Sequence, residues 1–386
     1  MPVIDHEALF VGVGRYLHHP DLPSCVDAAT CLRAELSRDY QDEPNWAPYP
    51  EDPSSVIGMV TENRLRKAAA ELFASSGMPR TLLFSFAGHA EPVFADGDAG
   101  SGMPIDLRLL TTDDDPEAER HGVLISELFA MVPVECGLVV IVDCCYAGVA
   151  ARMALPSPLR ACVLAACGER SRANISGQVQ SFGGTTVQLP EFTGALLAAL
   201  DGMAADVKGR ISLLSLFSNA SDLMPMKQKP VLATNGLDNL VMQTVKPALT
   251  SRQLREMVSR TEADDHDRSI AGGMIQGRDR HTGKTIDIEV NMPIPWLFDD
   301  PNGYCDVYPW MESDHFWVDY WNGDGSDITS SAMRQMKFLK VLKENGLLKA
   351  YVREDWRKSP NSADVETDLF FAVTARYDPQ SCRAGA

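Results

Sequence analysis

The sequence is short of basic residues. Lys and Arg number 35 against 53 Asp and Glu in 386 residues, so the formal charge is −18. A field of this sign repels phosphate backbones and anionic membranes, which argues against nucleic acid or a membrane surface as a partner. No uninterrupted apolar run approaches the ~18 residues that span a bilayer. The first apolar stretch has no basic cluster before it and no small-residue cleavage site after it, so no secretory signal is expected. We therefore expect a cytoplasmic location.

The cysteines include no C-x-x-C pair, which argues against a structural zinc site. There are nine, an odd number with irregular spacing, and several lie inside apolar runs. They are Cys25, Cys31, Cys136, Cys144, Cys145, Cys162, Cys167, Cys305 and Cys382. This usage predicts reduced, buried thiols rather than a disulfide framework, and we expect no bound metal.

What the first half does contain is a regular alternation of apolar runs and helical patterns. The runs are Ala8–Val13, Thr81–Phe86, Leu138–Val142 and Ala161–Ala166. Each is apolar on both alternating faces, as fully buried strands of a parallel sheet are. Helices are predicted over Ser24–Leu36, Thr61–Ser76, Tyr146–Met153 and Thr193–Leu200. A Ser24-x-x-Asp27 capping box should begin the first helix and Thr61 should cap the second. The alternation predicts a layered α/β domain.

Two polar stretches interrupt this pattern. Glu91–His121 includes GDAGSG and an acidic run, and we predict a surface loop excursion there. Gly168–Pro190 is polar and rich in glycine, and we predict a second, mobile loop.

The composition changes after about residue 250. Five of the six tryptophans fall between Trp296 and Trp356, with prolines and acidic residues between them. We therefore predict one domain over residues 1–248 and a Trp-rich accessory region over 249–386, with a helix at Ser330–Asn345. A tryptophan cluster of this kind is more often a small core than a ligand platform.

Two of the predicted strands end in reactive side chains. His89 follows Thr81–Phe86, and Asp143, Cys144 and Cys145 follow Leu138–Val142. If these strands are neighbours, an imidazole and a thiol meet at the carboxyl edge of the sheet, where active sites form. A helix N-terminus and an imidazole beside Cys145 would favour its thiolate, and His89 could protonate a leaving amine. The alternative is that both cysteines are small apolar fillers; the two motifs together favour catalysis.

These motifs resemble a known family. FSFAGHA (84–90) and VDCCYAG (142–148) are similar to the SGHG and D-S-C-H-S-G motifs of the caspase-like cysteine peptidases, in their metacaspase and prokaryotic branch. The His and Cys positions are 145 − 89 = 56 residues apart, close to the spacing of about 50 in animal caspases. Weaker similarities extend the resemblance over about residues 5–245. It implies a caspase-like three-layer sandwich with a mostly parallel central sheet.

The resemblance implies a role for each matching residue. Cys145 takes the nucleophile position, Cys144 takes the place of the motif's Ser, and His89 is the general acid and base. The backbone amides of Ala90 and Cys145 would form the oxyanion hole. Asp143 matches the acid on the floor of the pocket for a basic P1 residue.

The sequence departs from the family motifs at several positions. Ala87 and Ala90 replace a Ser and a Gly around His89, and Tyr146-Ala147 replaces His-Ser after Cys145. None of these changes removes a catalytic atom. In the first helix, Asp27 falls at the Asn of the family's G-C-V-N-D-A, so it is either a second acid of the P1 pocket or the capping-box residue.

The expected function is a cysteine endopeptidase that cuts proteins after Arg or Lys. Side chains repeat with period two along a strand, so Asp143 should lie on the same face as Cys145 and meet a cationic P1 residue. Alternatively, Asp143 caps the helix that follows. The alternative function is an inactive caspase-fold scaffold or partner-binding subunit.

Activation is expected to depend on loop cleavage or on a partner. Arg170 and Arg172 are the first candidate processing sites, and Arg108 and Arg120 the second, because loop tips are where nicking concentrates. The resemblance implies a regulated cell-death or defence cascade, in which an activating protease or regulatory protein would be the partner. No cofactor is expected, although the acidic run Asp113–Asp115 could attract calcium; a solvated loop is the alternative.

Overall fold

The structure is a computed structural model of the chain. It describes residues 6–247 apart from gaps at 75–79, 96–101, 118–120, 154–158, 175–177, 183–184, 207 and 225–226. Past residue 247 it describes Met257, Asn345 and the backbone of four strands. The chain divides into two compact units, one of Met1–Ala204 with Ile211–Val245 and the other of Ala205–Arg210 with Lys246–Ala386.

A seven-stranded sheet forms the centre of the first unit. Its order is β13-β9-β8-β4-β1-β2, and β3 also pairs with β1. The strands are β1 (His6–Val13), β2 (Ala47–Tyr49), β3 (Ile57–Gly58), β4 (Thr81–Ala87), β8 (Gly137–Asp143), β9 (Arg160–Ala165) and β13 (Val231–Asn235). Every pair is parallel except β9–β13. Strands β4 and β8 are buried along their whole length, which explains their uninterrupted apolar sequences.

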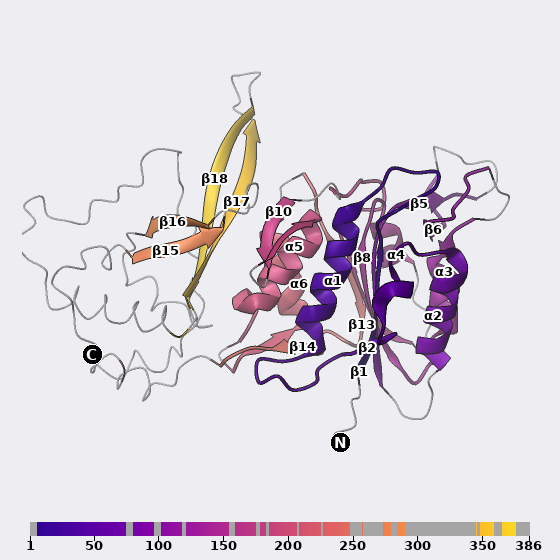
Figure 1. Ribbon diagram of the computed structural model, residues 1–386, viewed down its shortest axis with the longest axis horizontal. Coiled ribbons are helices and arrows are strands. Elements are labelled where there is room, and N and C mark those ends of the chain that lie inside the picture. Colours follow the sequence, from indigo (N-terminus) through magenta and orange to yellow (C-terminus); the bar gives the residue numbers. More distant parts are fainter. Residues whose placement is uncertain are drawn as a thin grey trace, which may run out of the picture. The chain divides into compact units, whose positions relative to one another are not determined.

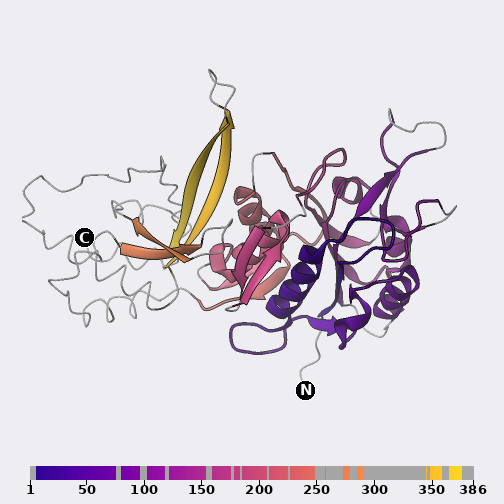
Figure 2. The ribbon, with the colours of Figure 1, turned by 45° about the horizontal axis from the view of Figure 1, so that its top comes forward.

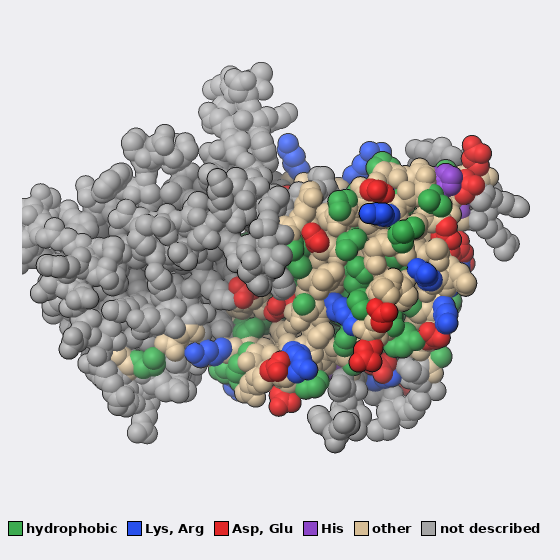
Figure 3. Space-filling view, in the orientation of Figure 1, with side chains coloured by type: hydrophobic (Ala, Val, Ile, Leu, Met, Phe, Trp, Pro, Cys, Tyr) green, Lys and Arg blue, Asp and Glu red, His purple; other side chains and the backbone are tan. Residues whose placement is uncertain are grey.

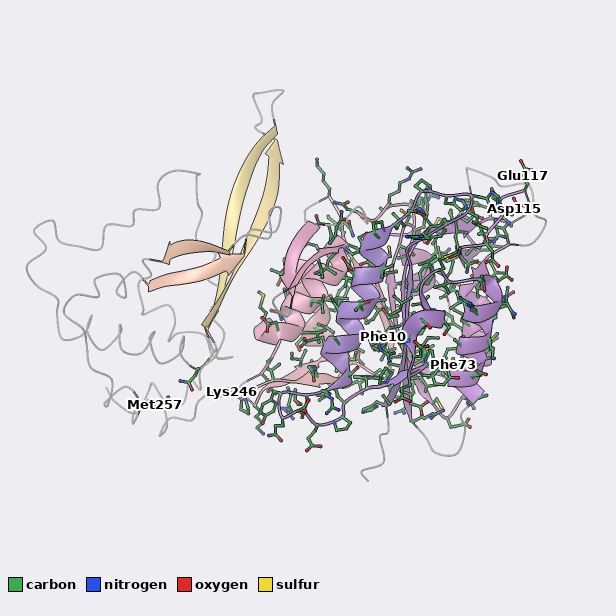
Figure 4. The ribbon with its side chains drawn as sticks, in the orientation of Figure 1. Phe10, Phe73, Asp115, Glu117, Lys246 and Met257 are labelled. Atoms are coloured by element: carbon green, nitrogen blue, oxygen red, sulfur yellow. The ribbon has the colours of Figure 1, made fainter. Side chains whose placement is uncertain are left out.

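Helices cover both faces of this sheet (Figures 1 and 2). One layer contains α1 (Pro23–Ser37), α5 (Glu191–Ala198) and α6 (Leu213–Asp222); the other contains α2 (Glu62–Ala74), α3 (Ile125–Met131) and α4 (Gly148–Arg152). Phe10 on β1 and Phe73 on α2 are buried in the interior of the sandwich (Figure 4). The three layers, with the mostly parallel sheet between two layers of helices, confirm the predicted α/β architecture.

Smaller elements surround the sandwich. Strands β5 (Ala90–Val93), β6 (Asp106–Leu109) and β7 (Val123–Leu124) form an antiparallel sheet in that order. A hairpin joins β10 (Gln178–Phe182) to β11 (Thr185–Leu189), and β12 (Arg210–Ser212) pairs with β14 (Val241–Thr244). The short helices are η1 (Pro53–Ser55) and the π-helical η2 (Ala199–Met203).

In the second unit the structure describes two antiparallel hairpins. One pairs β15 (Gly273–Arg278) with β16 (Thr285–Val290), and the other pairs β17 (Leu348–Lys358) with β18 (Val365–Ala375). The predicted helix over Ser330–Asn345 lies outside the described residues, except for Asn345 itself.

Several local predictions need correction. Helix α1 begins at Pro23 after Leu22, which makes no side-chain cap, so the Ser24–Asp27 capping box is wrong. The Glu91–His121 excursion contains most of β5 and all of β6, and Gly168–Pro190 contains the β10–β11 hairpin, so neither is simply a loop. Strand pairing satisfies the backbone groups of these polar segments, and β6 in addition buries Leu107 and Leu109.

Other local predictions hold. The four apolar runs are β1, β4, β8 and β9, and the Thr61 hydroxyl accepts a hydrogen bond from the Arg64 amide at the start of α2. All seven cysteines in the described part of the chain are free, and six are buried.

On the face shown in Figure 3, acidic and basic side chains are interspersed over the described residues. Across those residues, no helix has both the length and the hydropathy that crossing a membrane requires.

Candidate active site

Strand pairing brings the His and Cys motifs together. Strands β4 and β8 are parallel neighbours whose register pairs Ala87 with Asp143, the last residue of each strand. The Gly88 amide, just past the end of β4, donates to the Asp143 carbonyl at 3.4 Å. His89 and Cys145 therefore each lie two residues beyond a register pair, at the carboxyl edge of the sheet. The predicted adjacency of these strands is confirmed.

Contacts with the segment between β1 and α1 orient His89. Its backbone N–H donates to the Tyr16 hydroxyl at 2.8 Å, and its Nε2 lies 2.9 Å from the Pro20 carbonyl. A carbonyl can only accept, so Nε2 carries the proton and Nδ1 of a neutral ring is the basic nitrogen. Gly88 permits this approach, because a Cβ there would lie 2.7 Å from the Tyr16 hydroxyl.

His89 is half-buried, and this burial lowers the pKa of its imidazole. The contact with the Pro20 carbonyl opposes that effect, whereas nearby His19 lowers the pKa further. The ring is therefore neutral at neutral pH, the form that can accept a proton from a thiol.

Cys145 is the accessible thiol of the pair at the end of β8. It is partly exposed, and its Sγ lies 4.0 Å from the Ala173 carbonyl, whereas Cys144 is completely buried. Burial raises the pKa of the Cys145 thiol, opposed by its contact with Ala173 and by Arg172, and raises that of Cys144 well above its usual value. Cys145 is thus the residue that a substrate can reach.

The expectation of a resting Cys145 thiolate is wrong. Helix α4 begins only at Gly148, two residues later than predicted, and spans five residues. Between the thiol and the helix lies Tyr146, whose φ of 61° is in the left-handed region. Desolvation exceeds the favourable charges around Cys145, so its thiol is protonated in the free protein.

Asp143 is buried at the end of β8, with an exposed fraction of 1%. Its Oδ2 accepts hydrogen bonds from the Thr193 amide at 2.9 Å and the Thr193 hydroxyl at 2.6 Å. Its Oδ1 is buried and has no hydrogen-bond partner among the described residues. Burial raises the pKa of this carboxyl to about 6, although the Thr193 bonds oppose the shift.

Two arguments about Asp143 need correction. It does not cap the following helix α4: its partner Thr193 belongs to the first turn of α5, 50 residues away in the chain. The period-two argument also fails, because β8 ends at Asp143 and Cys145 lies beyond it. The two residues are nevertheless close enough to interact, since Asp143 raises the pKa of the Cys145 thiol.

The other predicted site residues lie in different settings. Asp27 on α1 uses Oδ2 to accept the Gln188 amide of β11 at 2.9 Å. Ala90, whose amide is a predicted oxyanion donor, is buried and begins β5 opposite Leu109.

The candidate processing sites also differ. Arg170 and Arg172 are exposed between β9 and β10, and Arg172 forms a hydrogen bond with the Tyr146 side chain. Arg108 lies in β6, the central strand of its sheet, and pairs with Glu91 at 2.6 Å. Arg120 lies outside the described residues.

The three aspartates of the acidic run that could attract calcium each contact a different group. Asp113 accepts the Glu62 amide and the Thr111 hydroxyl, both at 2.9 Å. Asp114 contacts His19 at 3.2 Å, and Asp115 accepts the Glu117 amide at an outer edge of the domain (Figure 4). Within the described ranges, no three His, Cys, Asp or Glu side chains converge to hold a metal ion.

Sequence reasoning missed the residues that support the site. Tyr16, His19 and Pro20 precede His89 by about 70 residues, and Thr193 follows Asp143 by 50. One signal was available: the polar segment Arg15–Asp21 directly follows β1, whose carboxyl end lies at the same sheet edge as those of β4 and β8.

Comparison with known proteins agrees with this geometry. Residues 6–154 match the family model of the metacaspase peptidase C14 domain, a range that includes both His89 and Cys145. No curated protein matches the chain.

Similar solved structures include a structural-genomics target protein from Geobacter sulfurreducens, with 14% identity, 63% of this chain and 100% of that chain covered, and a TM-score of 0.43. Another is caspase-1 from Spodoptera frugiperda, with 11% identity, 62% and 92% covered, and a TM-score of 0.41. TM-scores this low support no conclusion about function. The family match stands on its own: residues 6–154 are similar to the metacaspase peptidase C14 domain, and this similarity supports a caspase-like cysteine endopeptidase, a hydrolase.

Proposed function

We propose that the protein cleaves peptide bonds after Arg or Lys, with Cys145 as nucleophile and His89 as general acid and base. The observation that carries this proposal is the register of β4 and β8, which ends both strands at the same level and places His89 and Cys145 each two residues beyond. Cys145 is accessible and His89 has a basic Nδ1, so both groups have the form that acyl transfer needs.

The reaction starts from a neutral pair. As Cys145 Sγ attacks the scissile carbonyl carbon, the thiol proton passes to His89, and the backbone amides of Ala90 and Cys145 stabilise the resulting oxyanion. The C–N bond then breaks while His89 returns the proton to the leaving amine. Water, deprotonated by His89, attacks the thioester carbon; the C–S bond then breaks, the acid product leaves, and His89 returns the proton to the Cys145 thiolate.

Support for a basic P1 residue comes from Asp143. A buried carboxylate with one unpartnered oxygen is costly unless a charge or a donor meets it, and a guanidinium or ammonium group would supply both. The pKa of about 6 leaves the carboxyl ionised at neutral pH, as this pairing requires. Asp27 remains the second candidate acid.

We further propose that cleavage after Arg170 or Arg172, or binding of a regulatory protein, controls activity in a cell-death or defence cascade. Both arginines are exposed, and Arg172 acts electrostatically on Cys145, so a cut there would alter the surroundings of the nucleophile. We place the protein in the cytoplasm, because its buried free thiols suit a reducing compartment. Neither a nucleic acid nor a membrane is part of the proposal.

Labelling tests the proposal directly. An Arg chloromethyl ketone peptide should modify the wild type and the Cys144→Ala control on Cys145, as located by peptide mass spectrometry, and should leave Cys145→Ala unmodified. The same peptide with Asp at P1 should label far more slowly. Labelling that is unaffected by Cys145→Ala would refute the assignment and favour the inactive scaffold.

A further inference from the structure

Two groups of the segment Arg15–Asp21 set the position of His89. The Tyr16 hydroxyl accepts from its backbone amide, and the Pro20 carbonyl accepts from Nε2. The orientation of the catalytic ring therefore depends on how this segment is held.

Backbone contacts hold the beginning of the segment. The Leu17 amide donates to the Thr112 carbonyl at 2.9 Å, and the Thr112 hydroxyl donates to the Arg15 carbonyl at 2.8 Å. Closer to Pro20 the contact is between side chains: His19 Nε2 lies 3.2 Å from Asp114 Oδ2. His19 is the residue immediately before Pro20, and on the other side Asp21 Oδ1 accepts the Tyr16 amide at 3.0 Å, so these two contacts flank the carbonyl that orients His89.

Asp114 is well suited to anchor His19. Its side chain is fully buried whereas that of His19 is 22% exposed, and Oδ1 has no hydrogen-bond partner among the described residues. Burial raises the pKa of the Asp114 carboxyl, and the hydrogen bond from His19 is the first effect that opposes it.

Two other ionisable groups act on Asp114. His121 also stabilises its charge, but His121 Nε2 contacts Glu91 at 3.0 Å, and Glu91 itself disfavours the charge of Asp114. Loss of the His19 donor would leave a buried carboxyl without this hydrogen bond, which is costlier than losing an exposed contact.

We propose that His19 and Asp114 are positioning residues for catalysis: their contact fixes the Pro20 carbonyl, which holds His89 in the Nε2–H tautomer and leaves Nδ1 to exchange the proton with Cys145. Neither residue needs to touch the substrate. The catalytic part of this inference rests on the proposed function, whereas the tautomer does not.

The tautomer is measured by NMR of the ¹⁵N-histidine-labelled full chain, with the His89 signals identified by their loss in His89→Asn. The wild type should show Nε2 protonated. His19→Phe keeps a ring but removes the donor, and we expect a mixture of tautomers; His19→Ala is made as well, so that the result does not depend on one variant folding. His19→Gln restores an amide donor and should restore the Nε2–H form. His18→Phe, the adjacent exposed histidine, is the matched control.

Kinetics supply the second readout. His19→Phe should lower kcat at least about 10-fold, the scale on which supporting hydrogen bonds to an imidazole affect activity. KM should stay near its wild-type value, because a positioning residue acts on the proton transfer and not on substrate binding. His19→Gln and His18→Phe should keep kcat near the wild-type value.

Each remaining outcome is decisive. An unchanged tautomer in His19→Phe or His19→Ala, an equal shift in His18→Phe, or a His19→Gln as impaired as His19→Phe would overturn the proposal. A shifted tautomer in a protein without any peptidase activity would sustain the positioning role and reject the proposed function instead.

Discussion

Asp143 and Thr193 join two layers of the sandwich through one carboxylate oxygen. Asp143 Oδ2 accepts both the amide and the hydroxyl of Thr193, which connects the end of β8 to the first turn of α5. Oδ1 of the same carboxylate has no partner among the described residues. The two oxygens therefore differ: Oδ2 connects β8 to α5, and Oδ1 is the one that we propose a P1 cation meets, so the two roles can be tested separately.

Asp143→Asn should weaken cleavage after Arg with little structural cost. The Asn side-chain oxygen can still accept from Thr193, but the charge that would meet a P1 cation is lost. We expect kcat/KM for Arg substrates to fall about 10²-fold, the scale of leaving a buried charge unpaired at ~2–5 kcal/mol. Asp27→Asn, at the second candidate acid, should have a much smaller effect, because its Oδ2 already accepts the Gln188 amide. Efficient cleavage after Asp by the wild type, or an unchanged preference in Asp143→Asn, would contradict the assignment.

The stability of the wild type relative to Asp143→Asn should fall as the pH rises. The pKa of Asp143 is raised to about 6, so the fold favours its protonated form. The contribution of this form to the free energy of unfolding is fully present below the ordinary carboxyl pKa of about 3.9 and is lost as the pH rises through 6. Thermal or urea unfolding of both proteins between pH 4 and pH 8 measures the difference, which should change by at most about 3 kcal/mol. If the stability of the wild type relative to Asp143→Asn instead rose with pH, the fold would stabilise the charged carboxylate and the assignment would be wrong.

Cys145→Ala should abolish turnover, whereas Cys144→Ser should keep most of it. Cys145 reaches solvent, but Cys144 is buried and makes its contact through the backbone, where its carbonyl accepts from the Cys167 thiol at 3.5 Å. Alkylation of Cys145 by iodoacetamide should keep accelerating above the ordinary thiol pKa of about 8.5, because burial raises the pKa of this thiol. An alkylation rate that has already reached its maximum at neutral pH would instead indicate a resting thiolate.

Incubated enzyme should be cut after Arg170 or Arg172 rather than after Arg108. The first two side chains are exposed, whereas Arg108 belongs to a strand that is paired with neighbouring strands on both sides, so its backbone is not free to enter a protease cleft. N-terminal sequencing of fragments identifies the cut, with the double variant Arg170→Gln with Arg172→Gln as the uncut comparison. Full activity of a chain that remains intact would reject processing and leave a partner as the switch.

Removal of calcium should leave activity unchanged. Asp113, Asp114 and Asp115 already accept contacts from different groups, so the run does not present a common cage. The check is kcat/KM in EDTA against added CaCl₂, with Asp115→Asn as a control at the outer edge. Activity that requires calcium, and that Asp115→Asn impairs, would show that the run rearranges around the ion.

The sequence predicted the central sheet well because buried parallel strands leave a strong local signal. Strands β1, β4, β8 and β9 are apolar on both faces, and their boundaries differ from the predicted ones by two residues at most. The polar segments were harder. The hairpin β10–β11 and strands β5 and β6 pair through backbone hydrogen bonds, which do not depend on side-chain type, and the buried Leu107 and Leu109 of β6 are too short an apolar alternation to predict a strand.

By itself, the sequence determined which residues stand at the ends of the strands, and so that His89 and Cys145 could meet at one sheet edge. Only the tertiary structure decided the state of these groups. Burial and the Pro20 carbonyl set the charge and tautomer of His89, and desolvation rather than a helix terminus sets that of Cys145. A pKa depends on every group that surrounds a side chain in space, and these groups come from distant parts of the chain: Pro20 and His19 act on His89 from 69 and 70 residues away, and Thr193 acts on Asp143 from 50 residues away.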